Sequence, residues 1–96
     1  MSVEVSPAVE KKLLQKHQVT VQEVTQALNN RTRSILEDKR ENHKTDPPTW
    51  WIISSTNQLR SLKVCFIISD GTVVIKTAYE PNQVETDIYF RHSQEI

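Results

Sequence analysis

Apolar residues recur at helical spacing in the first third of the chain. Up to His17, Val9, Leu13 and Leu14 lie on one side and lysines on the other, after a Ser6-Pro7 pair typical of a helix start. The pattern predicts an amphipathic helix over residues 7–17. His17, at its end, is interpreted as a cap that suits the helix dipole.

A second helix is predicted from residue 21 to about residue 30. Thr20 and Glu23 have the spacing of a capping box, in which each side chain accepts a hydrogen bond from the other residue's backbone N–H. Val21, Val24 and Leu28 form the apolar stripe of this helix. Because only residues 17–19 separate the two helices, we expect them to pack as neighbours.

The second half of the chain alternates with the period of two that strands require. Strand-like runs cover residues 50–53, 59–68 and 72–79, and Asp70-Gly71 predicts a two-residue hairpin turn between the last two. The middle run places Leu62, Val64, Phe66 and Ile68 on one face and Lys63, Cys65 and Ile67 on the other. The last run places Val73, Ile75, Thr77 and Tyr79 on one face and Val74, Lys76 and Ala78 on the other. Lys63 and Lys76 lie near each other if the register allows it, and the sequence leaves that register open.

The remaining segments complete an α+β architecture. Residues 3–5 predict a short edge strand, and residues 32–38 are a candidate fourth strand of the meander. A last helix is expected from residue 82 to about residue 92, with Val84 and Ile88, and Tyr89 as a third candidate, on its inner face. We therefore predict one domain over residues 1–96: a strand, two packed helices, an antiparallel meander of three or four strands and a C-terminal helix.

The composition excludes several kinds of binding site and cross-link. A single cysteine excludes a disulfide framework and a cysteine-based zinc site, and Cys65 lies in an apolar run that predicts a buried thiol. Three scattered histidines lack zinc-ligand spacing, and one glycine, Gly71, cannot form a phosphate-binding loop. We expect no metal and no cofactor. With no signal-peptide pattern and no apolar run near the ~20 residues of a membrane span, we expect a cytoplasmic protein without a membrane segment.

The charge balance excludes only a nucleic-acid-binding protein that is strongly basic overall. Lys plus Arg and Asp plus Glu each number 12, so the formal net charge is zero. Residues 31–78, however, carry eight basic and five acidic side chains, and residues 79–96 carry one basic and four acidic. A neutral total is therefore compatible with a mildly basic sheet, whose field is weak beside that of a strong RNA binder.

Several segments resemble known bacterial proteins. Residues 16–24, KHQVTVQEV, followed by a β-meander, resemble the BrnT-like toxins of type II toxin–antitoxin systems, which are relatives of the RelE/ParE ribonuclease-toxin fold. Gln18 stands where their pattern has glycine, and Tyr79 where it tends to have a basic residue. The runs HKTDPPTW (43–50), LKV (62–64) and IKTAYEPN (75–82) resemble small proteins that often carry the transferred name ADP-ribosyl-(dinitrogen reductase) hydrolase. This second resemblance covers residues 3 to about 90.

The hydrolase name implies an activity that the residues do not favour. The known ADP-ribosylglycohydrolases are much longer, all-helical and magnesium-dependent. The acidic residues between positions 37 and 46 are interleaved with basic ones instead of forming the carboxylate cluster that a two-metal site needs. We therefore expect no such activity.

The toxin resemblance implies a metal-independent ribonuclease with an antitoxin protein and RNA as partners. That reaction needs a base for the 2′-hydroxyl proton, an acid for the leaving 5′-oxygen and cations for the phosphate. The catalytic candidates are His43, Arg60, Lys76 and Tyr79, and the candidates for RNA contact are Arg40 and Lys63. His43 is favoured for proton transfer, because it lies in a polar loop between basic residues and just before Pro47-Pro48.

Each candidate also has a plain structural interpretation. His43 and Arg60 are also interpreted as surface residues, Lys63 and Lys76 as solvent-facing strand lysines, and Tyr79 as a packing residue between strand and helix. Of the adjacent Trp50 and Trp51, one belongs to the core and the other to its rim, to a partner contact or to a base-stacking platform. The alternative function is a non-catalytic or degenerate toxin-fold module that binds a small protein partner.

Overall fold

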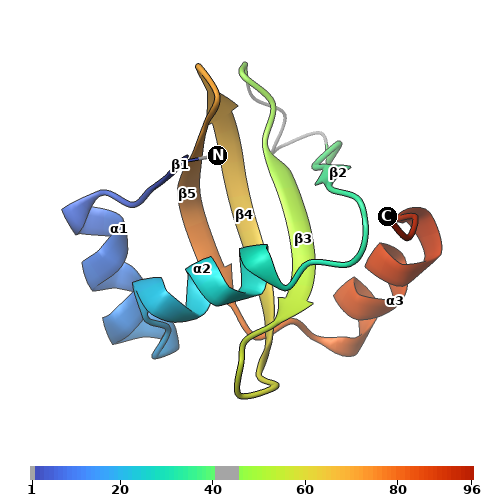
Figure 1. The fold of residues 1–96 in the computed structure, drawn as a ribbon, viewed down its shortest axis with the longest axis horizontal. Coiled ribbons are helices and arrows are strands. Elements are labelled where there is room, and N and C mark those ends of the chain that lie inside the picture. The colour runs from blue at the N-terminus through green and yellow to red at the C-terminus, as the bar shows by residue number, and fades with distance from the viewer. Residues whose placement is uncertain (1, 41–45) are drawn as a thin grey trace.

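One mixed sheet of five strands forms the centre of the protein (Figure 1). The computed structural model describes residues 2–40 and 46–96. Across the sheet the order is β1 (Ser2–Glu4), β5 (Thr72–Tyr79), β4 (Ser61–Ser69), β3 (Trp50–Ser55) and β2 (Leu36–Glu37). The α+β class and the N-terminal edge strand are confirmed. The sheet is mixed, because β1 pairs parallel to β5 while the other strands pair antiparallel. Of the candidate strand over residues 32–38, only β2 forms.

The helices begin where the sequence predicts. α1 (Pro7–Lys12) follows Ser6, whose hydroxyl accepts from the Val9 N–H, and it continues as a π-helical segment, η1 (Leu13–His17). α2 (Val21–Asn29) has the expected capping box, since the Thr20 hydroxyl accepts from the Glu23 N–H and the Glu23 carboxylate from the Thr20 N–H, at 3.1 and 3.0 Å. α2 crosses one face of the sheet (Figure 1).

Gln18 ends the first helix in an unusual backbone conformation. Its φ is 53°, in the left-handed region where a side chain costs about 1 kcal/mol and where glycine is favoured. Its N–H donates to the Leu14 carbonyl, and the Val19 N–H donates to that of Leu13. The turn between the helices is therefore fixed by backbone hydrogen bonds despite the missing glycine.

The β4–β5 hairpin contains a β-bulge that the sequence pattern does not reveal. The Asp70-Gly71 turn is confirmed, with positive φ at both residues and Ser69 paired with Thr72. Farther along, the register passes from Phe66–Ile75 to Cys65–Thr77, which leaves Lys76 as the extra residue.

The bulge corrects the faces predicted for β5. Beyond Lys76 the alternation is reversed, so Ala78, fully buried, joins Val73 and Ile75 on the α2 face. Tyr79 turns to the opposite face, where it pairs with Lys63 in the register. Lys63 and Lys76 are therefore not cross-strand neighbours.

α3 (Gln83–His92) packs on the other face of β3 through Tyr89. Tyr89 is fully buried, its ring lies 5.5 Å from that of Trp51, and its hydroxyl donates to the Ser34 carbonyl. The prediction that Val84 faces inward is wrong, because this side chain is 66% exposed, whereas Ile88 is 40% exposed and lines a cavity between α3 and the sheet. Trp51 is the core tryptophan and Trp50 is half-buried, as the alternation requires.

None of the helices in the described ranges is both long and apolar enough to cross a membrane.

Candidate functional site

A carboxylate, an ammonium group and a phenol meet on the α3 face of the sheet. Glu85 Oε2 accepts hydrogen bonds from Lys63 Nζ and from the Tyr79 hydroxyl, each at 2.8 Å. The Lys63 side chain is only 7% exposed and that of Glu85 21%, so this is a largely buried ion pair. We call Lys63, Tyr79 and Glu85 the Glu85 cluster.

Three local features bring the cluster together. The bulge turns Tyr79 onto the face of Lys63, its partner in the β4–β5 register. Only three residues separate Tyr79 from α3, and Asn82 caps that helix. Asn82 and Glu85 form a second capping box, in which Glu85 Oε1 accepts from the Asn82 N–H at 3.0 Å. One oxygen of Glu85 is thus used for the cap while the other faces Lys63 and Tyr79.

A cavity of about 400 Å³ opens over the cluster. Lys63, Glu85, Trp51 and Arg40 contribute to its walls, and Lys63 Nζ lies 4.7 Å from the centre of the Trp51 ring. The guanidinium of Arg40 binds the Asp38 carboxylate with Nε and Nη2 at 3.0 and 2.8 Å, and its side chain remains 61% exposed. The two residues predicted for RNA contact, Arg40 and Lys63, therefore lie at one cavity.

The cluster holds its members in defined protonation states. Partial burial on its own would raise the pKa of the Glu85 carboxyl, but Lys63, the Asn82 N–H and Tyr79 together hold that pKa below its usual range. Burial on its own would lower the pKa of Lys63, but the hydrogen bond to Glu85 and the interactions with Cys65 and Tyr79 together raise it. Burial and the bond to Glu85 both raise the pKa of Tyr79. At neutral pH the cluster is a carboxylate, an ammonium and a neutral phenol.

Acidic pH should remove the stability that this ion pair contributes. A carboxyl whose pKa is lowered by folding stabilises the protein above its unfolded pKa and loses that effect as pH falls through the folded pKa. We expect Glu85→Gln to destabilise the protein most near neutral pH, and the difference from wild type to shrink as the pH falls below about 5. Urea denaturation at several pH values measures this, and a pH-independent difference would contradict it.

A second, polar cavity of about 310 Å³ lies beside Tyr79. It is lined by Lys16, His17, Gln18, Arg60, Tyr79 and Glu80. The His17 ring lies 5.5 Å from the Tyr79 ring, centre to centre, at an angle of 36°. His17 thus has a ring contact beyond its predicted place at the helix end. Tyr79 is shared by this His17 cavity and the Glu85 cluster.

Arg60 is almost fully occupied by contacts within the protein. Its Nε donates to Glu80 at 2.7 Å and Nη1 to Glu23 at 3.0 Å. Nη1 and Nη2 also donate to the carbonyls of Gln18 and His17, at 2.8 and 3.2 Å. The catalytic candidate Arg60, directly before β4, thus links that end of the strand to the turn between the first two helices.

The two remaining catalytic candidates are Lys76 and His43. Lys76, the bulge residue, is exposed. His43 falls outside the described residues, so its role stays a prediction.

Lys63 was interpreted as a solvent-facing strand lysine. That interpretation is wrong, because the residue is 5% exposed. Cys65 is half-buried rather than buried, and burial raises the pKa of its thiol.

Sequence reasoning missed Glu85. Its sequence signal is the Asn82-x-x-Glu85 capping-box spacing directly after a strand, which fixes where α3 starts and which carboxylate turns back toward the sheet. The pattern gives no hint that the second carboxylate oxygen meets Lys63, because that contact depends on the β4–β5 register.

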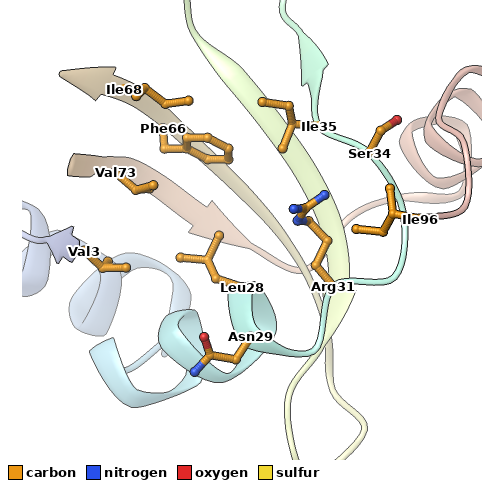
Figure 2. Close-up of a pocket in the computed structure, with 10 residues that line it drawn as sticks. All are labelled: Val3, Leu28, Asn29, Arg31, Ser34, Ile35, Phe66, Ile68, Val73 and Ile96. Atoms are coloured by element: carbon orange, nitrogen blue, oxygen red, sulfur yellow. The ribbon is translucent and has the colours of Figure 1, made fainter. Parts of the chain in front are cut away.

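An apolar groove of about 480 Å³ lies on the α2 side of the sheet (Figure 2). Phe66, Ile68 and Val73 project into it from β4 and β5, and Leu28 and Arg31 approach from the end of α2 and the segment after it. Its walls are mostly aliphatic and aromatic, so the groove is a candidate contact surface rather than a place for polar chemistry.

The described residues contain no group of three His, Cys, Asp or Glu side chains that could hold a metal ion. Searches with the chain found no matching family model and no significant match among curated proteins.

Proposed function

We propose that this protein is a metal-independent ribonuclease and the toxin component of a bacterial type II toxin–antitoxin system. The observation that carries the ribonuclease proposal is the Glu85 cluster: an ionised carboxylate bonded to a buried lysine and a tyrosine at a cavity that Arg40 borders. Perturbed titratable groups that converge on a cleft are typical of functional sites. A largely buried ion pair also adds little net stability, because the cost of removing both charges from water offsets their attraction, so stability alone does not explain it.

The residue types match the chemistry of RNA transesterification. Glu85 would accept the proton of the ribose 2′-hydroxyl, and the 2′-oxygen would attack the adjacent phosphorus. Lys63 and Arg40 would stabilise the added negative charge on the phosphate oxygens. The bond from phosphorus to the 5′-oxygen then breaks, and a proton donor completes the 5′-hydroxyl. The products are a 2′,3′-cyclic phosphate and a free 5′-hydroxyl.

The mechanism needs a more basic Glu85 carboxylate, and binding of the RNA substrate would supply it. A carboxylate whose pKa is held low by Lys63 is a weak base. An RNA phosphate in the cavity competes for the Lys63 ammonium, which weakens its bond to Glu85 and makes the carboxylate more basic. Tyr79 keeps the freed carboxylate oriented through its hydroxyl.

The toxin class rests on the resemblance of residues 16–24 and the following meander to BrnT-like proteins. We expect expression in bacteria to arrest growth, and co-expression of an antitoxin from a neighbouring gene to relieve the arrest. RNA binding by the purified protein should weaken steeply with added salt, because phosphate contacts release counterions. Normal growth together with no RNA affinity at low salt would overturn the proposal.

The charge pairing and the apolar groove favour the second candidate, a non-catalytic module that binds a small protein. Arg40, Arg60 and Lys63 each bind carboxylates of the protein itself, which leaves little surplus positive charge for RNA. The groove offers an apolar surface instead. In this case Ile68→Asp abolishes complex formation with the product of the neighbouring gene, measured by co-purification, and Lys76→Asp does not. An intact complex with Ile68→Asp would exclude the groove as the docking surface.

A further inference from the structure

We propose that His17 is the general acid of this site and that the leaving 5′-oxygen of the RNA lies in the His17 cavity. The inference deepens the proposed ribonuclease function and rests on it. It assigns the second proton transfer to a histidine that the sequence interpretation treated as a helix cap.

The Tyr79 side chain connects the two halves of the site. Its hydroxyl donates to Glu85, and its ring is in contact with the imidazole of His17. A phosphate placed over Tyr79 therefore has the carboxylate base at the hydroxyl end of this side chain and the imidazole beside the ring. In this proposal the cavity over the Glu85 cluster and the His17 cavity take the nucleotides on the two sides of that phosphate, and Tyr79 lines the His17 cavity.

Hydrogen bonds from Arg60 fix the backbone of the turn that carries His17. Arg60 donates to the carbonyls of both His17 and Gln18 and is held in turn by Glu23 and Glu80. Gln18 adopts the left-handed conformation that turns the chain at this point. Arg60 is thus a positioning residue for His17, because it holds the backbone of the turn that carries the imidazole.

The proton transfers balance without any further reactant. Glu85 takes the proton of the 2′-hydroxyl as the bond from the 2′-oxygen to phosphorus forms. Protonated His17 gives its proton to the 5′-oxygen as the bond from phosphorus to that oxygen breaks. A later proton exchange with water restores both groups. The charged and titratable neighbours that line the cavity of His17 are Lys16, Arg60, Tyr79 and Glu80.

The test compares two leaving groups at the linkage that the wild-type protein cleaves. One RNA has the natural 5′-oxygen, and the other has sulfur in its place, which leaves as a thiolate and needs no proton. We expect His17→Gln and His17→Asn to slow cleavage of the natural RNA about 10²- to 10⁴-fold, and to slow cleavage of the thio-substituted RNA less than about 10-fold. His92→Gln, an exposed histidine at the end of α3, is the matched control and should cleave both like wild type.

The outcomes separate this inference from the proposed function. Equal losses on both substrates would give His17 a structural role only and overturn the inference, as would unimpaired cleavage by the His17 variants. A leaving-group effect that follows His43→Gln instead would assign the acid to that histidine. If wild-type protein cleaves neither RNA, the proposed function itself fails, and the role of His17 fails with it.

Discussion

Glu85→Gln should reduce RNA cleavage about 10²- to 10⁴-fold, the usual contribution of a general base. The amide cannot accept the 2′-hydroxyl proton at neutral pH. It does keep a carbonyl oxygen for the Asn82 N–H, so the start of α3 is preserved. Single-turnover cleavage of a labelled RNA measures the loss, and circular dichroism at the same temperature verifies that the variant is folded.

The matched control for this prediction lies on the same helix. Asp87→Asn also removes one carboxylate from α3, but Asp87 is exposed, and among the described residues its carboxylate accepts a hydrogen bond from the Gln83 side chain. Its cleavage rate should stay within about twofold of wild type, because Asp87 is an exposed residue outside the Glu85 cluster. If both variants lost activity equally, the effect would come from net charge and not from the site.

Lys63→Met should cost about 2–3 kcal/mol of unfolding free energy, the largest stability effect that we expect in the sheet. Methionine fills the volume of the lysine stem but leaves Glu85 without its ammonium partner. Removing one member of a fully buried ion pair costs about 3–5 kcal/mol, and the partial exposure of Glu85 lowers that figure. For a domain of this size, the loss corresponds to a decrease in Tm of roughly 10 °C or more.

Two further variants show whether this cost comes from the pair. Lys76→Met removes an exposed lysine from the neighbouring strand and should change the stability by less than about 0.5 kcal/mol. The double variant Lys63→Met, Glu85→Gln should regain part of the loss, because no unpaired buried charge remains. Urea denaturation of the three variants gives the comparison. A stable single Lys63→Met variant would mean that the ion pair contributes nothing.

Local signals in the sequence predicted the elements well. The Thr20–Glu23 capping box, the Ser6-Pro7 helix start and the Asp70-Gly71 turn each involve residues within four positions of one another, so their geometry is encoded where it occurs. The alternation along β4 also held, because one face of that strand packs against the core.

The site could not be predicted in the same way, because it depends on pairing between segments. Strict alternation would place Tyr79 on the same face as Val73 and Ile75, and only the bulge at Lys76 turns it toward Lys63. The inner face of α3 was predicted only in part, because apolar Val84 is 66% exposed and the buried contact is made by Tyr89. Glu85 was missed for a related reason: its role depends on a lysine 22 positions earlier in the chain.

The chemical ends of the cleaved RNA test the central claim most directly. With EDTA present, purified protein should produce upstream fragments that end in a 2′,3′-cyclic phosphate and downstream fragments that begin with a 5′-hydroxyl. Mass spectrometry identifies both ends. Products with a 3′-hydroxyl and a 5′-phosphate, or no cleavage at all under these conditions, would contradict the assignment of the Glu85 cluster as a metal-independent ribonuclease site.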